Sequence, residues 1–136
     1  PADFGGCTAD GRAVLIEVKN LGIKSLPVES WEMADKTRAA RGRGSKTKGF
    51  AGLKYHQLEA LIATSKSGGV GVVIVRFAGA GVWALDGLGL DAWENGMGDS
   101  KGNLGSISLD HFRDCGWGLG DDKLWSIPPE IFERSV

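Results

Sequence analysis

The chain has 136 residues, of which 42% are hydrophobic and 24% are charged, with a formal net charge of -1. This length suits one domain, residues 1–136, and this composition excludes a disordered or collagen-like chain. No apolar run approaches the ~18 residues that a membrane-spanning helix needs, and no secretory leader is recognisable, so we expect a cytoplasmic protein.

The first predicted element is a β-hairpin formed by residues 3–7 and 13–19. Asp10-Gly11 between them is a strong hairpin-turn signal. The second strand is so apolar that we expect it to be central in its sheet. Side chains alternate between the two faces of a strand, so Glu17 and Lys19 should share one face at its far end.

Residues 20–30 predict a loop and a short extended segment, and residues 31–52 predict a basic loop insertion. Between residues 36 and 48 there is no acidic residue. The rest of the chain has a net charge of about -7 by the same count. A basic loop on an acidic body favours a polyanionic partner, although a solubilising loop or a targeting patch would look the same. The predicted phosphate-binding residues are Lys36, Arg38, Arg41, Arg43, Lys46, Lys48 and the following Lys54.

An amphipathic helix is predicted at about residues 53–66, ended by Gly68-Gly69. Its buried stripe should consist of Leu58, Leu61, Ile62 and Ser65. Residues 70–77 are an apolar run of strand length, typical of a buried parallel strand, and residues 82–85 form a further short strand. This order predicts an α/β fold with a central mixed β-sheet flanked by helices.

The pattern weakens toward the C-terminus. We expect a short helix at residues 88–93, a glycine-rich loop at 95–106, and a short helix capped by Ser108 that runs to Cys115. The tail should pack back on the core through Leu124, Trp125, Ile127, Ile131 and Phe132.

Cysteines and glycines add no further motif. Cys7 and Cys115 are too few for a disulfide framework, and their spacing matches no zinc motif. We expect two reduced thiols. The glycine-rich stretches match neither a Walker loop nor a dinucleotide fingerprint.

The residues with the clearest chemical potential are Asp3, Glu17 and Lys19. Two carboxylates on adjacent strands, joined by the backbone carbonyl of Val18, make the oxygen-rich site that Mg²⁺ prefers. Lys19 lies two residues after Glu17, so it faces the same site and can orient water and offset developing negative charge. Such a set suits phosphodiester hydrolysis.

A single Glu-x-Lys is common and is usually a solvated strand face. Three features favour the catalytic interpretation: the triplet ends an apolar strand, an acid lies one hairpin earlier, and a basic loop follows. His56 is a weaker candidate for a general base, because such a residue is more often a partly buried hydrogen-bonding group.

The sequence resembles a known family through residues 1 to about 94. The matching pieces are P-A-D-F-G-G, G-R-A-V-L-I-E-V-K-N, S-L-P, H-Q-x-x-x-L and an apolar strand ending in R-F. They are similar to RecU-type Holliday junction resolvases, a branch of the PD-(D/E)XK nucleases. The resemblance implies a restriction-endonuclease-like core, with Asp3 and Glu17 on Mg²⁺ (or Mn²⁺), Lys19 as the motif lysine, and Gln57 shaping the site. It also implies a homodimer that nicks four-way DNA junctions in recombination and repair.

The sequence departs from the family in two places. The family's N-terminal helix with a further acidic group, and a DNA-contacting projection, would precede Pro1. The stretch between S-L-P and H-Q is longer and contains the basic cluster. These differences leave open a VRR-type nuclease domain, a structure-blind DNase, or a non-catalytic DNA-binding or assembly module with the same fold.

Overall fold

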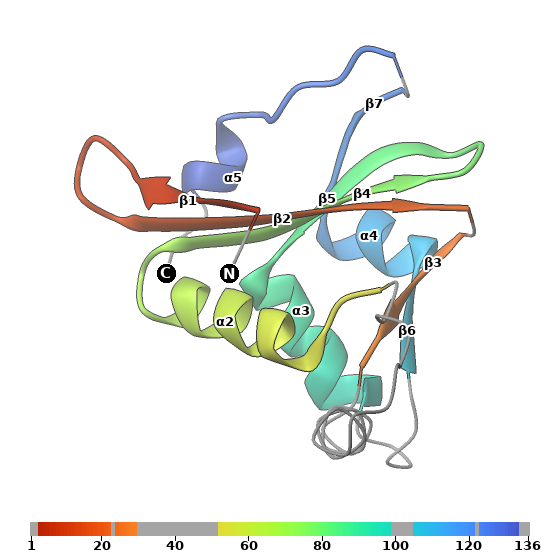
Figure 1. Cartoon of the computed structure of the whole chain (residues 1–136), viewed down its shortest axis with the longest axis horizontal. Coiled ribbons are helices and arrows are strands. Elements are labelled where there is room, and N and C mark those ends of the chain that lie inside the picture. The colour runs from red at the N-terminus through yellow and green to blue at the C-terminus, as the bar shows by residue number, and fades with distance from the viewer. Residues whose placement is uncertain (1–2, 23, 30–51, 99–104, 122, 134–136) are drawn as a thin grey trace, which may run out of the picture.

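The structure, a computed structural model, describes residues 3–22, 24–29, 52–98, 105–121 and 123–133. This part of the chain contains both strands and helices, and three strands precede the first helix (Figure 1). The elements are β1 (Phe4–Cys7), β2 (Ala13–Leu21), β3 (Ser25–Val28), α2 (Tyr55–Lys66), β4 (Val70–Phe77), β5 (Gly81–Asp86), α3 (Gly87–Trp93), a π-helix (Glu94–Gly98), β6 (Gly105–Ser108), α4 (Leu109–Cys115), β7 (Trp117–Gly120) and α5 (Glu130–Glu133).

The main sheet has five strands in the order β1-β2-β4-β5-β7. Only the β2–β4 pair is parallel; the other neighbours are antiparallel. Helices α2, α3 and α4 cover one face, and α5 lies on the other (Figure 1). The predicted α/β class with a mixed central sheet is therefore confirmed, and the architecture is compatible with a restriction-endonuclease-like core.

Strands β2 and β4 are neighbouring inner strands of the sheet, as their apolar sequences predict, and β4 is the central one. Their parallel register runs from Val14 opposite Val70 to Leu21 opposite Phe77. Nearly every residue of β4 is buried, which explains why its sequence shows no polar alternation. The connection between two parallel strands must cross over the sheet, and α2 lies in this connection.

Helix α2 packs tightly on β4 because small residues let the two backbones approach. A Cβ placed on Gly71 would lie 2.4 Å from the carbonyl oxygen of Leu61. The Ser65 hydroxyl, also buried, accepts hydrogen bonds from the backbone N–H groups of Gly71 at 3.3 Å and Gly87 at 3.1 Å. The helix ends at Lys66, and the chain turns away at Gly68, whose φ of 88° suits glycine. The predicted buried stripe of this helix is confirmed.

A second, two-stranded sheet consists of β3 and β6. Leu26 and Ile107, opposite each other in it, are both fully buried. Beyond β3, the backbone bonds to the segment just before α2: Leu53 N donates to Pro27 O at 2.8 Å, and Glu29 N donates to Leu53 O at 2.9 Å. The end of β3 and the residue that leads into α2 therefore lie side by side.

Apolar residues fill both faces of the main sheet. On the helical face, Phe112 of α4 meets Phe77 of β4 edge to face, with ring centroids 5.1 Å apart. On the other face, Val72 and Ile74 pack in one cluster with Ile131 of α5. Cys7 and Cys115 are both free thiols, as predicted. None of the helices among the described residues is long and apolar enough to cross a membrane.

The C-terminal half differs from the prediction. The expected loop at 95–106 contains the end of the π-helix and the first residues of β6, and β7 was not predicted at all. Part of the tail prediction was wrong, because Leu124 is 81% exposed and Trp125 is 40% exposed. Ile127, Ile131 and Phe132 do pack on the sheet. The helix capped by Ser108 is confirmed, with its hydroxyl accepting from His111 N at 3.4 Å.

Substitution of Gly71 by Ala tests the close approach of α2 to β4. The new methyl group would meet the Leu61 carbonyl oxygen at 2.4 Å, so we expect the free energy of unfolding to fall by about 1–3 kcal/mol. Urea denaturation measures this. Gly6→Ala in β1 is the control, because a Cβ there meets nothing within 4 Å. Equal midpoints for the two variants would contradict the close contact.

Candidate active site

The β1–β2 hairpin brings Asp3 opposite Glu17. Phe4 pairs with Ile16 in the antiparallel register. Continuing this register by one residue places Asp3 opposite Glu17. The turn that sets this register contains Gly11, whose φ is 87°. The predicted juxtaposition of the two carboxylates thus follows from strand pairing.

Asp3 is exposed and is fixed by the backbone of β2. Its Oδ2 accepts a hydrogen bond from Val18 N at 2.7 Å. In an extended strand the N–H and C=O of one residue point toward the same edge. The Val18 carbonyl, predicted as a metal ligand, therefore faces the edge of β2 on which Asp3 lies.

Glu17 is a buried carboxylate with a side-chain partner on α2. It is only 2% exposed, and its Oε2 accepts a hydrogen bond from Gln57 Nε2 at 3.2 Å. The other end of the Gln57 amide is also held, because its Oε1 accepts from Lys54 N at 3.0 Å. Both hydrogen bonds together orient the amide, so its N–H group points at Glu17. The structure thus brings Gln57 to the predicted site.

The electrostatic surroundings disfavour the charged form of Glu17. Burial raises the pKa of Glu17 above its ordinary value, and the negative charge of Asp3 raises it further. The positive charge of Lys19 acts in the opposite direction. Lys19 is half-buried and, two residues along β2, shares the face of Glu17. A cation placed between the two carboxylates would relieve their mutual repulsion.

Of the predicted phosphate-binding residues, the structure describes only Lys54. Lys54 precedes α2 and is half-buried next to Gln57. The other six, Lys36, Arg38, Arg41, Arg43, Lys46 and Lys48, lie outside the described residues. His56 is exposed on the first turn of α2.

Glu29 was not among the predicted site residues. This carboxylate follows β3, is 7% exposed, and accepts a hydrogen bond at Oε1 from Tyr55 N at 3.1 Å. In the sequence, Glu29 is marked only by its place directly after β3, and an acid in such a place is ordinarily solvated. Its contact with α2 joins residues 26 positions apart, which the sequence alone could not reveal.

The donor set fits a hard divalent cation such as Mg²⁺. Asp3, Glu17 and the Val18 carbonyl offer oxygen atoms only, which is the ligand type that Mg²⁺ takes, together with several waters. Within the described ranges, no group of three or more His, Cys, Asp or Glu side chains could hold a metal ion. A site here would therefore depend on two carboxylates, a carbonyl and water.

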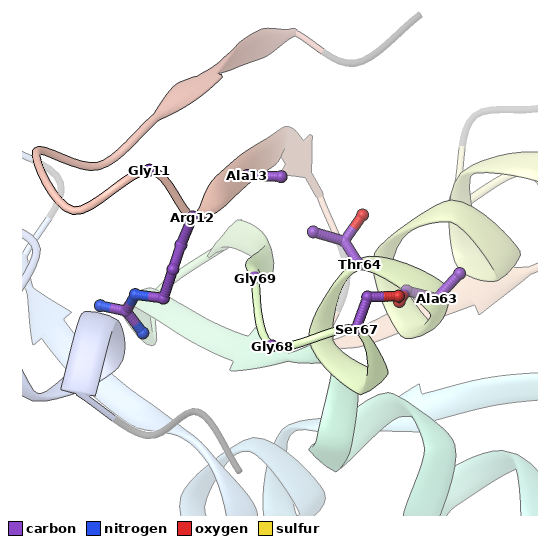
Figure 2. Close-up of a pocket in the computed structure, with 8 residues that line it drawn as sticks. All are labelled: Gly11, Arg12, Ala13, Ala63, Thr64, Ser67, Gly68 and Gly69. Carbon is purple, nitrogen blue, oxygen red and sulfur yellow. The ribbon is translucent and has the colours of Figure 1, made fainter.

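A pocket of about 430 Å³ lies elsewhere, between the start of β2 and the C-terminal end of α2 (Figure 2). Its lining includes Arg12 and Gly69 but none of the candidate site residues. The hydroxyls of Thr64 and Ser67, which also line it, donate to carbonyls of their own helix. The pocket is therefore separate from the candidate site.

No protein-family model matches the sequence, and no curated protein shows significant similarity to it.

Substitution of Glu17 by Gln tests the electrostatic strain of the site. Since folding raises the Glu17 pKa, the stability that this residue contributes is present below its ordinary value of 4.5 and is lost as the pH rises through the raised pKa. The glutamine side chain does not ionise. In chelator-treated protein we expect Glu17→Gln to raise the melting temperature at pH 8 but not at pH 4, as measured by circular dichroism.

At pH 8, Mg²⁺ should make the wild type more stable than Glu17→Gln. At ten times its dissociation constant, Mg²⁺ would add about 1.4 kcal/mol to wild-type stability, and it should add little to Glu17→Gln. Glu59→Gln, on the exposed face of α2, is the matched control and should respond to Mg²⁺ like the wild type. A wild-type protein that is as stable at pH 8 as Glu17→Gln, without metal, would argue against the strain.

Proposed function

We propose that this protein is a Mg²⁺-dependent endonuclease of the PD-(D/E)XK type that hydrolyses phosphodiester bonds in DNA. The observation that carries the proposal is the hydrogen bond from Gln57 to buried Glu17, opposite Asp3. Strand geometry predicted that Asp3 and Glu17 share a site, and the family resemblance added Gln57, although 40 positions separate Glu17 from Gln57. Their meeting supports the proposal.

Each residue of the site has a distinct role in the proposed reaction. Asp3, Glu17 and the Val18 carbonyl would hold Mg²⁺, which as a Lewis acid polarises phosphate oxygens and lowers the pKa of water. Lys19 orients the attacking water and offsets negative charge that develops on the phosphate. Gln57 holds the carboxylate of Glu17 in one orientation, so that it does not rotate away from the cation.

The proposed substrate is DNA, in its most specific form a four-way junction cut by a homodimer. A two-fold symmetric dimer would present two equivalent sites to two strands of matching polarity. The basic cluster would bind phosphates with little sequence preference. Both ends of the segment that contains it, Glu29 and Leu53, are joined by a backbone hydrogen bond of 2.9 Å just before α2. We also propose a cytoplasmic location, which would suit DNA as substrate.

The alternative from another class is a DNA-binding or assembly module that keeps the fold without catalysis. A VRR-type structure-specific nuclease domain would retain the chemistry with a different substrate. These alternatives differ from the resolvase in what is cut, so substrate comparison separates them.

The test is cleavage of labelled four-way, flap and linear duplex DNA in Mg²⁺. Asp3→Asn and Lys19→Ala should each reduce the cleavage rate by about 100-fold or more, because each removes charge that acts on the transition state. Asp114→Asn and Lys24→Ala, at exposed positions of α4 and just before β3, should cleave like the wild type.

The pattern of products identifies the substrate class. Paired symmetrical cuts in the junction alone would support the resolvase. Cuts in all three substrates would retain the nuclease and remove junction specificity. DNA that is bound but not cut by wild-type protein, in Mg²⁺ or Mn²⁺, would overturn the proposed reaction in favour of the binding module.

A further inference from the structure

Glu29 is a buried acid to which the proposed reaction assigns no role. It lies directly after β3 and is 7% exposed, yet its Oε1 faces the start of α2 and accepts from Tyr55 N at 3.1 Å. Its backbone position is fixed as well, because Glu29 N donates to Leu53 O at 2.9 Å. The carboxylate is thus held rigidly against the first residue of the helix.

The turn that Glu29 binds is the one that carries Gln57. Tyr55 is the first residue of α2 and Gln57 the third. Gln57 Oε1 accepts from Lys54 N at 3.0 Å, and Gln57 Nε2 donates to Glu17 Oε2 at 3.2 Å. A continuous path of hydrogen bonds and one helical turn therefore connects Glu29 to the candidate metal ligand Glu17.

The physical need for such a contact lies in the helix terminus. The first N–H groups of a helix have no partner within the helix, and a carboxylate beside them also interacts favourably with the helix dipole. Without an acceptor at Tyr55 N, the first turn could fray and the Gln57 amide would lose its fixed direction toward Glu17.

We propose that Glu29 is a positioning residue of this site: by binding the first turn of α2 it holds the Gln57 amide on Glu17. Its effect on catalysis rests on the proposed nuclease function, whereas its effect on Gln57 does not. Glu29 does not touch the reacting atoms; it acts through Gln57.

Three variants of the full chain test this role. Glu29→Ala removes the acceptor, and Glu29→Gln keeps an oxygen acceptor without the charge. Asp86→Ala is the matched control, because Asp86 is also a buried carboxylate that binds a helix start, accepting from Gly89 N at 2.9 Å on α3. Thermal unfolding establishes that each variant is folded at the assay temperature.

The first readout is independent of activity. The side-chain NH₂ signals of Gln57, assigned by their loss in Gln57→Leu, report its hydrogen bond in nitrogen–proton NMR spectra. We expect Glu29→Ala to shift these signals and to speed hydrogen exchange of the amides of residues 54–58. Glu29→Gln should retain most of the wild-type pattern, and Asp86→Ala all of it. Unchanged Gln57 signals in folded Glu29→Ala protein would overturn the proposal.

The second readout is cleavage kinetics in Mg²⁺. Glu29→Ala should lower kcat by about 10- to 100-fold with little change in KM for DNA, since supporting contacts of a metal site typically matter to this extent. Glu29→Gln should restore most of the rate, and Asp86→Ala should keep kcat even if it lowers the melting temperature. Equal losses in Glu29→Ala and Asp86→Ala would reduce Glu29 to a general stabiliser. Wild-type protein without cleavage would end the proposed function while the NMR result still decides the role of Glu29.

Discussion

The parallel pairing of β2 with β4 is the constraint on which the rest of the structure depends. Two parallel neighbours require a connection that crosses the sheet, and α2 supplies it by running back along β2. Its C-terminal end lies beside residues 11–13, as the shared pocket lining shows, and its first turn lies further along β2, over the middle of the strand. Glu17 is the central residue of β2, which is why a helix residue 40 positions away reaches it.

Close packing turns this arrangement into a defined geometry. The approach of α2 to β4 at Gly71, and the hydrogen bonds that the Ser65 hydroxyl accepts from Gly71 N of β4 and Gly87 N of α3, fix the height and rotation of the helix. Hydrogen bonds of about 3 Å tolerate little displacement, so the contact between Gln57 and Glu17 also depends on this packing near the other end of α2. Small residues on the sheet thus contribute indirectly to the geometry of the site.

Much of the fold could be predicted because its signals are local. The hairpin turn, the alternation in β2, the apolar run of β4 and the stripe of α2 each depend on neighbouring residues, and each was found. The short strands β6 and β7 have only four residues each and owe their structure to partner strands. Leu124 and Trp125 were expected in the core, but apolar residues in a loop are buried only if the path of the loop allows it.

In the candidate site too, the residues that could be predicted are those related by local geometry or by the resemblance. Asp3, Glu17 and Lys19 could be predicted because strand geometry relates them directly, and Gln57 because of a resemblance. Glu29 could not, since its role depends on where α2 begins in space. The basic cluster lies outside the described residues, so its place relative to the site stays a prediction.

The burial of Glu17 bears most directly on the choice between catalysis and simple DNA binding. A module that only binds DNA gains affinity from exposed cationic side chains. It gains no affinity from two apposed carboxylates, because these repel phosphate. Burying an acid beside another acid is costly, and here burial and Asp3 both raise the Glu17 pKa. Proteins keep such strained groups mainly where function uses them. A divalent cation would offset the repulsion between the two carboxylates. Together with Lys19 on the same face, it would also let the acidic pair lie close to a phosphate backbone without repelling it.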